Sequence, residues 1–244
     1  RGASTVFRLT SLSGMVATIY GKFFYPKIDL GGLAFEGAAI DVKSQGWIEG
    51  DIYGGQLKRD SGSPGINTPT VLRLYKATQA YINVTVDGYT GVQADSPGGG
   101  LFTCIESSDS YVYIKSKNPI YSAATVHNIH IQASRNITLD GEFNNFGARG
   151  VYVSGANKFL TIKGKFFITQ NIGTGVIIFT PGTPGGTDGH TSSCTISSEF
   201  YHNGSDTVDM ISLNGSGNSR TEGTLILGAK AIGRNAASVP NFLD

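Results

Sequence analysis

Short segments in which apolar and polar residues alternate recur along the chain. The sequence ITLDGEF at residues 137–143 returns as LTIKGKF at 160–166 and as CTISSEF at 194–200, and LILGAKA at 225–231 is a weaker copy. Alternation with a period of two is typical of a β-strand with one buried face. Earlier segments of the same kind start at Val112, Val84 and Ile48, so that successive starts are 36, 28, 25, 23, 34 and 31 residues apart.

A second apolar segment lies inside each repeat. Gly, Asn and Asp residues, which tolerate a positive φ, occupy the turns between the two segments. The second strands centre on Leu74, Cys104, Ile129, Val151, Val176 and Met210. Repeats of this kind are typical of a solenoid, in which neighbouring repeats bury each other's apolar faces. We therefore predict an all-β fold: a right-handed single-stranded parallel β-helix of about seven rungs with loop insertions at 47–244, preceded by an N-terminal lead-in and cap at 1–46.

The composition agrees with this fold class and excludes others. Glycine makes up 34 of the 244 residues and charged residues only 15%, whereas a helical bundle needs charged helix faces and few glycines. A net charge of +1 without a basic stripe excludes nucleic acid as a partner. No apolar run reaches the roughly 18 residues of a membrane span, so we expect no membrane insertion. Cys104 and Cys194 are expected to be buried thiols, and neither a metal site nor a cofactor is predicted.

Stacking the first strands by their starting residues places charged side chains in two outward columns. Signs alternate along both columns, as expected where strands ~4.8 Å apart bring neighbouring side chains into contact. We therefore interpret Asp140 and Glu142 as ladder partners rather than as a catalytic pair. The first column holds Asp87, Lys115, Asp140 and Lys163, and the second holds Lys117, Glu142, Lys165, Glu199 and Lys230.

Stacking the second strands gives a different outward column, which is mostly apolar. A long apolar stripe on an outer face is typical of an interaction surface. Two interpretations remain open, because the chain's own loops could cover the stripe or a homo-oligomer could form through it, and we favour the homo-oligomer. The column consists of Tyr75, Ile105, His130, Tyr152, Ile177 and Ile211.

The longer repeats carry inserted loops, and loops on a rigid solenoid are a common place for function. These insertions span 53–70, 87–100, 180–193 and 214–223 and are polar, rich in glycine and lightly aromatic. Such a composition suits a carbohydrate, whose hydroxyls need short polar partners and whose ring faces need aromatic ones. Tyr89 and His190 are the insertion residues that we expect to contact a saccharide.

Two pairs of carboxylates are the candidate catalytic residues. Hydrolysis of a glycosidic bond needs two carboxyl groups ~5 to 9.5 Å apart. Asp206 and Asp209 precede one second strand, and Arg149 lies in a lower rung, so this group suits an acidic sugar; Asp206 could also form only a turn. The second pair, Glu49 and Asp51, points to one outward face; the alternative is that both are solvated strand residues without catalytic function. Trp47 lies beside this pair and is either a platform for a sugar ring or a core residue.

The N-terminal segment carries a family resemblance. The sequence VATIYGKFFYPKIDLGGLAF at 16–35 resembles the G-Y-Y…D-x-G-G-G-x-F lead-in of bacteriophage tailspikes and capsule depolymerases, although Leu33 replaces the third glycine. The rungs from 112 to 235 are similar to the pectate-lyase-like superfamily. The resemblance implies a homotrimer in the virion tail that binds, and often cleaves, a bacterial surface polysaccharide such as capsule or lipopolysaccharide.

Two other functions stay open beside a tailspike-type depolymerase. One is a monomeric, secreted pectate-lyase-like lyase or hydrolase, and the other is a receptor-binding adhesin without enzymatic activity. If the chain is an enzyme, the paired carboxylates favour a glycoside hydrolase over a lyase. The first residue is Arg1 rather than Met, so we expect the chain to be the middle of a longer protein with attachment segments beyond one or both ends.

Overall fold

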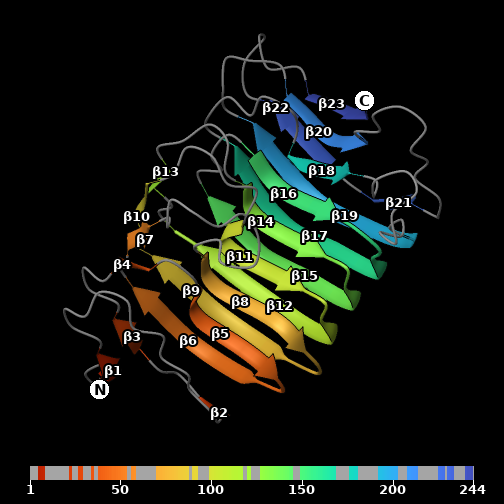
Figure 1. The fold of residues 1–244 in the computed structure, drawn as a ribbon. Helices are drawn as coiled ribbons and strands as arrows, with labels where there is room; N and C mark the ends of the chain where they lie inside the picture. Colours follow the sequence, from red (N-terminus) through yellow and green to blue (C-terminus); the bar gives the residue numbers. More distant parts are fainter. Residues whose placement is uncertain are drawn as a thin grey trace.

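A computed structural model describes strands from residue 5 to residue 243 and some of the turns between them (Figure 1). All regular structure in these residues is β-strand, and each strand pairing is parallel. Within the same part of the chain, no helix is long and apolar enough to span a membrane. The described residues are 5–8, 22–23, 27–29, 34–35, 38–53, 56–58, 70–87, 90–92, 99–117, 120–121, 127–144, 149–168, 176–180, 192–202, 208–213, 225–228, 230–233 and 240–243.

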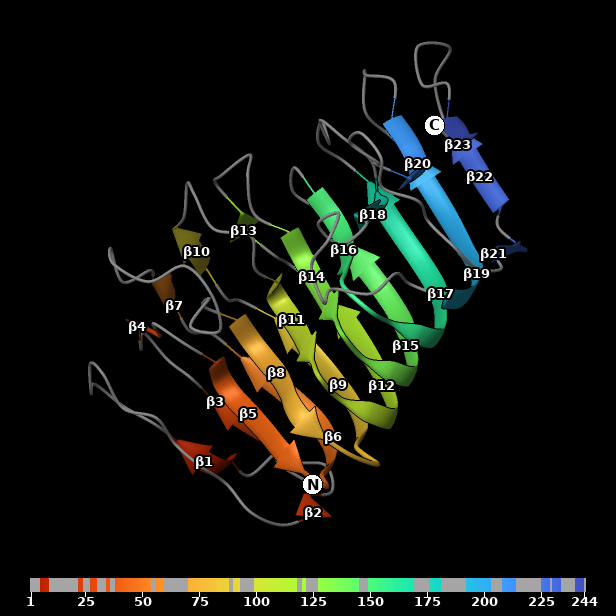
Figure 2. The same ribbon diagram turned by 45° about the vertical axis from the view of Figure 1, so that its right-hand side comes forward.

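From residue 27 to residue 132, successive described strands enter three sheets in turn, and from residue 135 to residue 213 they alternate between two of these sheets, so the chain winds as a β-solenoid (Figure 2). Sheet A contains β1 (Thr5–Arg8), β3 (Lys27–Asp29), β6 (Trp47–Tyr53), β9 (Tyr81–Asp87), β12 (Ser108–Ser116), β15 (Arg135–Asn144), β17 (Lys158–Ile168), β19 (Ser192–His202) and β21 (Leu225–Leu227), with β2 (Lys22–Phe23) beside β6 and β22 (Lys230–Gly233) beside β19. Sheet B is short and contains β4 (Ala34–Phe35), β7 (Gln56–Lys58), β10 (Thr90–Val92) and β13 (Ile120–Tyr121). Sheet C contains β5 (Ala38–Ser44), β8 (Thr70–Ala77), β11 (Gly99–Ile105), β14 (His127–Gln132), β16 (Arg149–Ser154), β18 (Ile177–Thr180), β20 (Val208–Leu213) and β23 (Pro240–Leu243).

The predicted β-helical organisation is thus confirmed as a parallel β-solenoid. Strands before residue 47 already belong to it, since β3 pairs with β6 and β5 pairs with β8. The division into a lead-in at 1–46 and a body at 47–244 stays a prediction.

The register of the first strands agrees with the repeat in the second half of the chain. Ile137 pairs with Leu160, Leu160 with Cys194, and Cys194 with Leu225, as the sequence repeat predicts. The earlier part of the alignment was wrong by two residues, because Val112 pairs with Leu139 instead of with Ile137. A shift of two residues keeps every side chain on its predicted face and changes only its partners.

The predicted apolar outward column on sheet C is wrong. Ile177 pairs with Val151 and Ile211 with Ile177, and all three side chains are fully buried inside the solenoid. The reason is local: residues 176–179 are Val, Ile, Ile and Phe, so the apolar pattern contains no alternation from which to choose a face. The chain enters β18 one residue out of the predicted register, and a shift of one residue exchanges the two faces of a strand.

The remaining members of that column belong to two different rows. Tyr75 and Ile105 are partners, and Ile105 continues to Gln132 rather than to His130. His130 pairs instead with Tyr152. The surface through which we predicted a homotrimer therefore does not exist as a continuous apolar stripe.

The interior of the solenoid is filled by rows of matched side chains. Phe143, Phe166 and Phe200 stack with ring centroids 4.9 and 5.4 Å apart and are fully buried. Both thiols are buried as predicted, and this burial raises the pKa of Cys104 to about 11 and that of Cys194 to about 12.

Four described corners between a strand of sheet C and the next strand of sheet A, from β8–β9 to β16–β17, each contain two residues with a positive φ. A buried hydrogen-bond ladder then joins successive corners. The Ser107 hydroxyl accepts the Ala77 N–H at 3.1 Å, Ser134 accepts the Ser107 N–H at 3.2 Å, and the Asn157 side-chain oxygen accepts the Ser134 N–H at 2.9 Å. The positive-φ residues form one row of Lys76, Glu106, Ala133 and Gly155 and a second row of Gln79, Asp109, Asn136, Phe159 and Ser193.

Glycine is needed where the repeat reads DGE and KGK. Gly141 and Gly164 have φ of 155° and 118°, and a Cβ at Gly141 would lie 2.0 Å from the Ile114 carbonyl oxygen. The backbones of adjacent strands approach too closely there for a side chain.

Candidate functional site

The outer face of sheet A carries the predicted charge ladder, with one change of member. Lys115, not Lys117, begins the second column, and its ammonium lies 2.7 Å from Glu142. Glu142 pairs with Lys165, Lys165 with Glu199, and Glu199 with Lys230. The alternation of sign along this column is therefore confirmed.

The first predicted column is correct only at its upper end. Lys163 lies 3.3 Å from Asp140, whereas Asp87 pairs with Tyr53 and not with Lys115. Asp140 and Glu142 each form an ion pair with a lysine of a neighbouring strand, so the interpretation of both as ladder partners is confirmed.

Beside these charges runs a row of aromatic side chains. Trp47 pairs with Tyr81 and Tyr81 with Tyr111 on the three adjacent strands β6, β9 and β12. The ring centroids are 5.0 Å apart for Trp47 and Tyr81 and 5.5 Å apart for Tyr81 and Tyr111. Because the two tyrosine rings stack nearly parallel, with 18° between their planes, their faces are turned toward each other. Trp47, at the end of the row, has 36% of its surface exposed.

The orientation of Trp47 is set by a hydrogen bond on its own strand. The indole Nε1–H donates to Glu49 Oε1 at 2.8 Å, which places a carboxylate beside an exposed aromatic ring. Asp51 follows two residues later on the same strand, so it shares the outward face. Asn83 and Thr85 lie level with Glu49 and Asp51 on the next strand and add short polar side chains.

At the Tyr111 end of the aromatic row lie two oppositely charged side chains, Asp140 and Lys163, which form an ion pair. The Tyr111 hydroxyl donates to Asp140 Oδ2 at 3.3 Å, and the Lys163 ammonium lies 5.8 Å from the centre of the Tyr111 ring. Partial burial, followed by the Asp140 charge, raises the pKa of Tyr111. The hydroxyl of Tyr111 therefore stays protonated and remains a hydrogen-bond donor at neutral pH.

The structure brings together three of the predicted site residues. Trp47, Glu49 and Asp51 lie on β6, within one outward face. Strand rise separates the backbone positions of Glu49 and Asp51 by ~6.5 to 7 Å.

The other predicted site residues lie elsewhere or outside the described residues. Arg149 on β16 and Asp209 on β20 belong to sheet C with β18 between them, and their side chains are outside the described part of the structure. Asp206, Tyr89 and His190 also lie outside the described residues. In the described part of the chain, no three His, Cys, Asp or Glu side chains gather in a way that could hold a metal ion.

The tyrosines of the aromatic row were missed at the sequence level. Trp47, Tyr81 and Tyr111 each stand immediately before the first aliphatic residue of a strand, namely Ile48, Ile82 and Val112. This aromatic-apolar dipeptide was the available signal. It was hidden because the predicted alignment paired Val84, rather than Ile82, with Val112.

The fold and its outer face define a parallel β-solenoid with a surface row of aromatic and carboxylate side chains. Comparison with protein-family models, curated proteins and solved structures finds no match to this chain. Any function must therefore be argued from the side chains themselves.

Proposed function

We propose that the chain is the carbohydrate-binding body of a bacteriophage tailspike-type protein and that it binds a bacterial surface polysaccharide along the outer face of sheet A. The observation that carries this proposal is the exposed indole of Trp47, oriented by Glu49 at 2.8 Å and continued by Tyr81 and Tyr111. The resemblance of residues 16–35 to a tailspike lead-in supports the choice of protein class.

The chemistry of a sugar fits this arrangement at two levels. The apolar face of a pyranose ring packs on an aromatic side chain, and Trp47 offers such a surface. The hydroxyls at the edge of the ring need acceptors and donors, which Glu49, Asp51 and Asn83 supply on the adjacent positions. Since this face repeats from strand to strand, an extended polymer would meet similar rows along its length.

The finer features of the tailspike hypothesis form part of the same proposal. Right-handed winding is supported by the strong preference of parallel crossover connections for that hand. Seven coils correspond to the seven starts of the sequence repeat. The homotrimer and the location in a virion tail rest on the family resemblance, because the apolar column that also supported a trimer is absent. Sedimentation of the purified chain at micromolar concentration tests the trimer separately from binding.

Cleavage of the bound polysaccharide is the second candidate function, and the observation that favours it is the shared outward face of Glu49 and Asp51. In a hydrolase of this type, one carboxyl group donates a proton to the leaving oxygen and the other acts as base or nucleophile. Replacing Glu49 with Gln and Asp51 with Asn would then abolish the release of new reducing ends while the polysaccharide still binds. Release of reducing ends that is unchanged in both variants would exclude this pair as the catalytic residues.

Binding can be tested with the protein's own fluorescence, because Trp47 is the single tryptophan of the chain. Titration with purified capsule or lipopolysaccharide fragments should shift or quench its emission as the sugar excludes water from the indole. In calorimetry, Trp47→Ala should lower the affinity about two- to tenfold, in line with the ~0.5–1.5 kcal/mol of an aromatic contact.

A matched control uses an aromatic side chain at the opposite end of the same face. Tyr201 stacks on Phe167 with ring centroids 4.9 Å apart, so Tyr201→Ala removes a surface aromatic residue far from Trp47 along the sheet order. Its affinity should equal that of the unmodified chain. Equal losses in both variants, or an unchanged emission of Trp47 in every bound state, would contradict the proposed site.

A further inference from the structure

One corner of the solenoid, where β17 begins, stacks two cations on each other. Arg135 of β15 and Lys158 of β17 are direct register partners, and both are exposed. Register partners on neighbouring strands lie ~4.8 Å apart, and like charges at that distance destabilise a sheet. This pair therefore opposes the fold.

The pair is an exception to the rule that governs the rest of the described strands. With histidine taken as neutral, every other register pair of charged residues in the described sheets combines opposite signs. These pairs are Arg8 with Asp29, Lys27 with Asp51, Asp41 with Arg73, Lys115 with Glu142, Glu142 with Lys165, Lys165 with Glu199, and Glu199 with Lys230.

The nearest carboxylate compensates only one of the two cations. Asp109 lies 3.7 Å from the Arg135 guanidinium and accepts a hydrogen bond of 3.0 Å from the Asn136 amide. This hydrogen bond is the largest cause of the lowered pKa of Asp109, so the carboxylate stays charged and is already bound to Asn136 and Arg135. Among the residues that the structure describes, none forms an ion pair with Lys158.

The next residue, Phe159, is exposed and conformationally strained. Its φ is 56° and 59% of its surface is exposed. Asn136 and Ser193 occupy the same corner position on the strands below and above, also with positive φ. Asn adopts this conformation readily, whereas a bulky aromatic residue does so at a cost. The corner imposes this backbone conformation on the whole row, so the feature of Phe159 that points to a ligand is its exposed aromatic ring.

We propose that Arg135, Lys158 and Phe159 form a second binding site, which takes a sugar residue bearing a carboxylate or phosphate group. The anionic group binds between the two cations and removes their repulsion, and the apolar face of the sugar ring packs on Phe159. The site deepens the proposed function, on which it rests for the class of ligand, because it selects acidic polysaccharides. It lies at the corner between sheets C and A, on strands other than β6, which carries Trp47.

The first test compares galacturonate oligomers with the same oligomers after methyl esterification, using calorimetry on the full chain. The charged oligomers should bind more tightly, and Lys158→Gln should lower their affinity about two- to fivefold at low salt without affecting the neutral form. Lys76→Gln is the matched control, since Lys76 occupies an equivalent corner but lies 3.5 Å from Glu106. Its affinity should not change. An equal loss for Lys76→Gln, or none for Lys158→Gln, would overturn the proposal.

The second test uses Phe159→Asn, which copies the residue found one strand below. This variant should fold at least as well as the unmodified chain and yet bind the galacturonate oligomers about threefold to tenfold more weakly. Retained affinity in the folded variant would show that Phe159 does not contact the ligand. Inorganic phosphate provides a further arm: if it competes with the oligomers at equal concentration, the corner is a simple anion site and the sugar assignment fails.

Failure of this site can be told apart from failure of the proposed function. If neutral glycans change the Trp47 emission but Lys158→Gln has no effect on charged ones, only the corner proposal is wrong. If no glycan changes the Trp47 emission while the charged oligomers still lose affinity in Lys158→Gln, the corner site stands and the sheet A site is wrong.

Discussion

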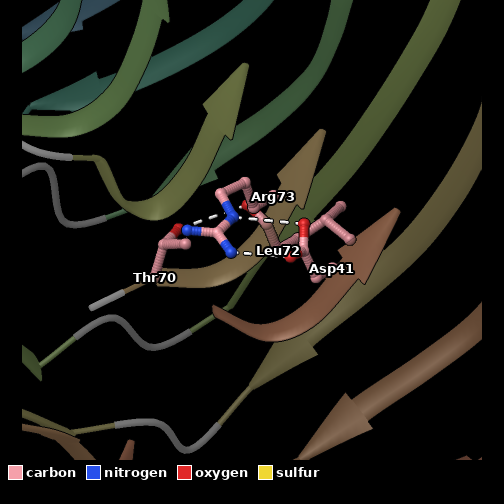
Figure 3. Close-up of polar contacts among 4 residues, drawn as sticks. All are labelled: Asp41, Thr70, Leu72 and Arg73. Atoms are coloured by element: carbon pink, nitrogen blue, oxygen red, sulfur yellow. Dashed lines mark hydrogen bonds and ion pairs between the residues drawn. The ribbon is translucent and has the colours of Figure 1, made fainter. Parts of the chain in front are cut away.

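The outer faces of sheets A and C both carry oppositely charged neighbours, but in very different surroundings. On sheet A, the side chains of Lys115 and Glu142 are 42% and 34% exposed. On sheet C, the side chains of Arg73 and Asp41 are only 14% and 8% exposed, and the guanidinium makes two hydrogen bonds to the carboxylate, at 3.1 and 2.6 Å (Figure 3). The same strand alternation has therefore produced one solvated and one largely buried polar face.

The difference in solvent exposure decides how much each row of polar side chains contributes to the stability of the fold. A buried ion pair has given up its hydration, so each charge depends on its partner, whereas an exposed pair can exchange its partner for water. His130 continues the row of Asp41 and Arg73 on sheet C and is also buried. The polar residues of this described row of sheet C thus stabilise the fold. The exposed polar side chains of sheet A can exchange their hydrogen bonds with water for hydrogen bonds with a ligand while the protein stays folded. For this reason we place the proposed sugar site on sheet A.

The largest predicted effect comes from breaking the buried pair on sheet C. Asp41→Ala should lower the free energy of unfolding by about 3 to 5 kcal/mol, because Arg73 is left as an uncompensated buried charge. Chemical denaturation of the purified variant measures this loss. Glu142→Gln on sheet A, measured in the same way, should change the stability far less.

A double variant separates the loss of the charge pair from the loss of packing. Replacing Asp41 with Leu and Arg73 with Met together removes both charges while filling similar space, and the stability should recover most of the single variant's loss. If Asp41→Ala and Glu142→Gln were equally mild, the contrast between the two faces would be wrong.

The next effect in size is a pH dependence caused by His130. Its imidazole Nε2 lies 2.8 Å from the Ser154 hydroxyl, and its ring packs against Tyr152 with centroids 5.1 Å apart. Burial lowers the pKa of His130 from 6.5 to about 4. The unfolded chain therefore binds a proton between pH 6.5 and 4 that the folded chain does not, so the stability falls as the pH falls through this window.

The expected contribution is about 3 kcal/mol lost between pH 7 and pH 4. Other groups also titrate in this range, so the measurement is the difference between the unmodified chain and His130→Gln at each pH. The variant should be less stable at pH 7 because it loses the packing of the imidazole ring against Tyr152, but its stability should fall less steeply toward pH 4. Parallel stability curves for the two proteins would show that His130 is not kept neutral by burial.

The sequence predicted the fold class, and it predicted which side chains of a strand face outward wherever the repeat contained polar markers. The glutamate and lysines within DGE, KGK and SSE identify the outward face of β15, β17 and β19 without ambiguity. The run of four apolar residues at 176–179 contains no such marker, and there the predicted face of Ile177 was wrong. Polar residues on a strand therefore carry more register information than apolar ones.

The candidate site was only partly predictable, for the same physical reason. Trp47, Glu49 and Asp51 could be placed together because they share one strand, where a period of two decides the face. Tyr81 and Tyr111 join them only through the pairing of β6, β9 and β12, and a two-residue error in that pairing separates the rings. The conflict between Arg135 and Lys158, in contrast, was within reach of the sequence, because the correctly predicted alignment of Ile137 with Leu160 also places these two cations opposite each other.

The smallest predicted effect tests whether the face of sheet A is as solvated as the comparison requires. Lys165 lies between Glu142 and Glu199 in the ladder, so Lys165→Glu places three carboxylates in a row. The stability should fall by roughly 0.5 to 1 kcal/mol at low ionic strength, because like charges then face each other on adjacent strands. In about 1 M salt, where the screening length is only ~3 Å, the variant should regain nearly all of this loss. A loss that persists in high salt would mean that the ladder is shielded from solvent, and the polar rows of sheet A would then be structural in the same sense as Asp41 and Arg73.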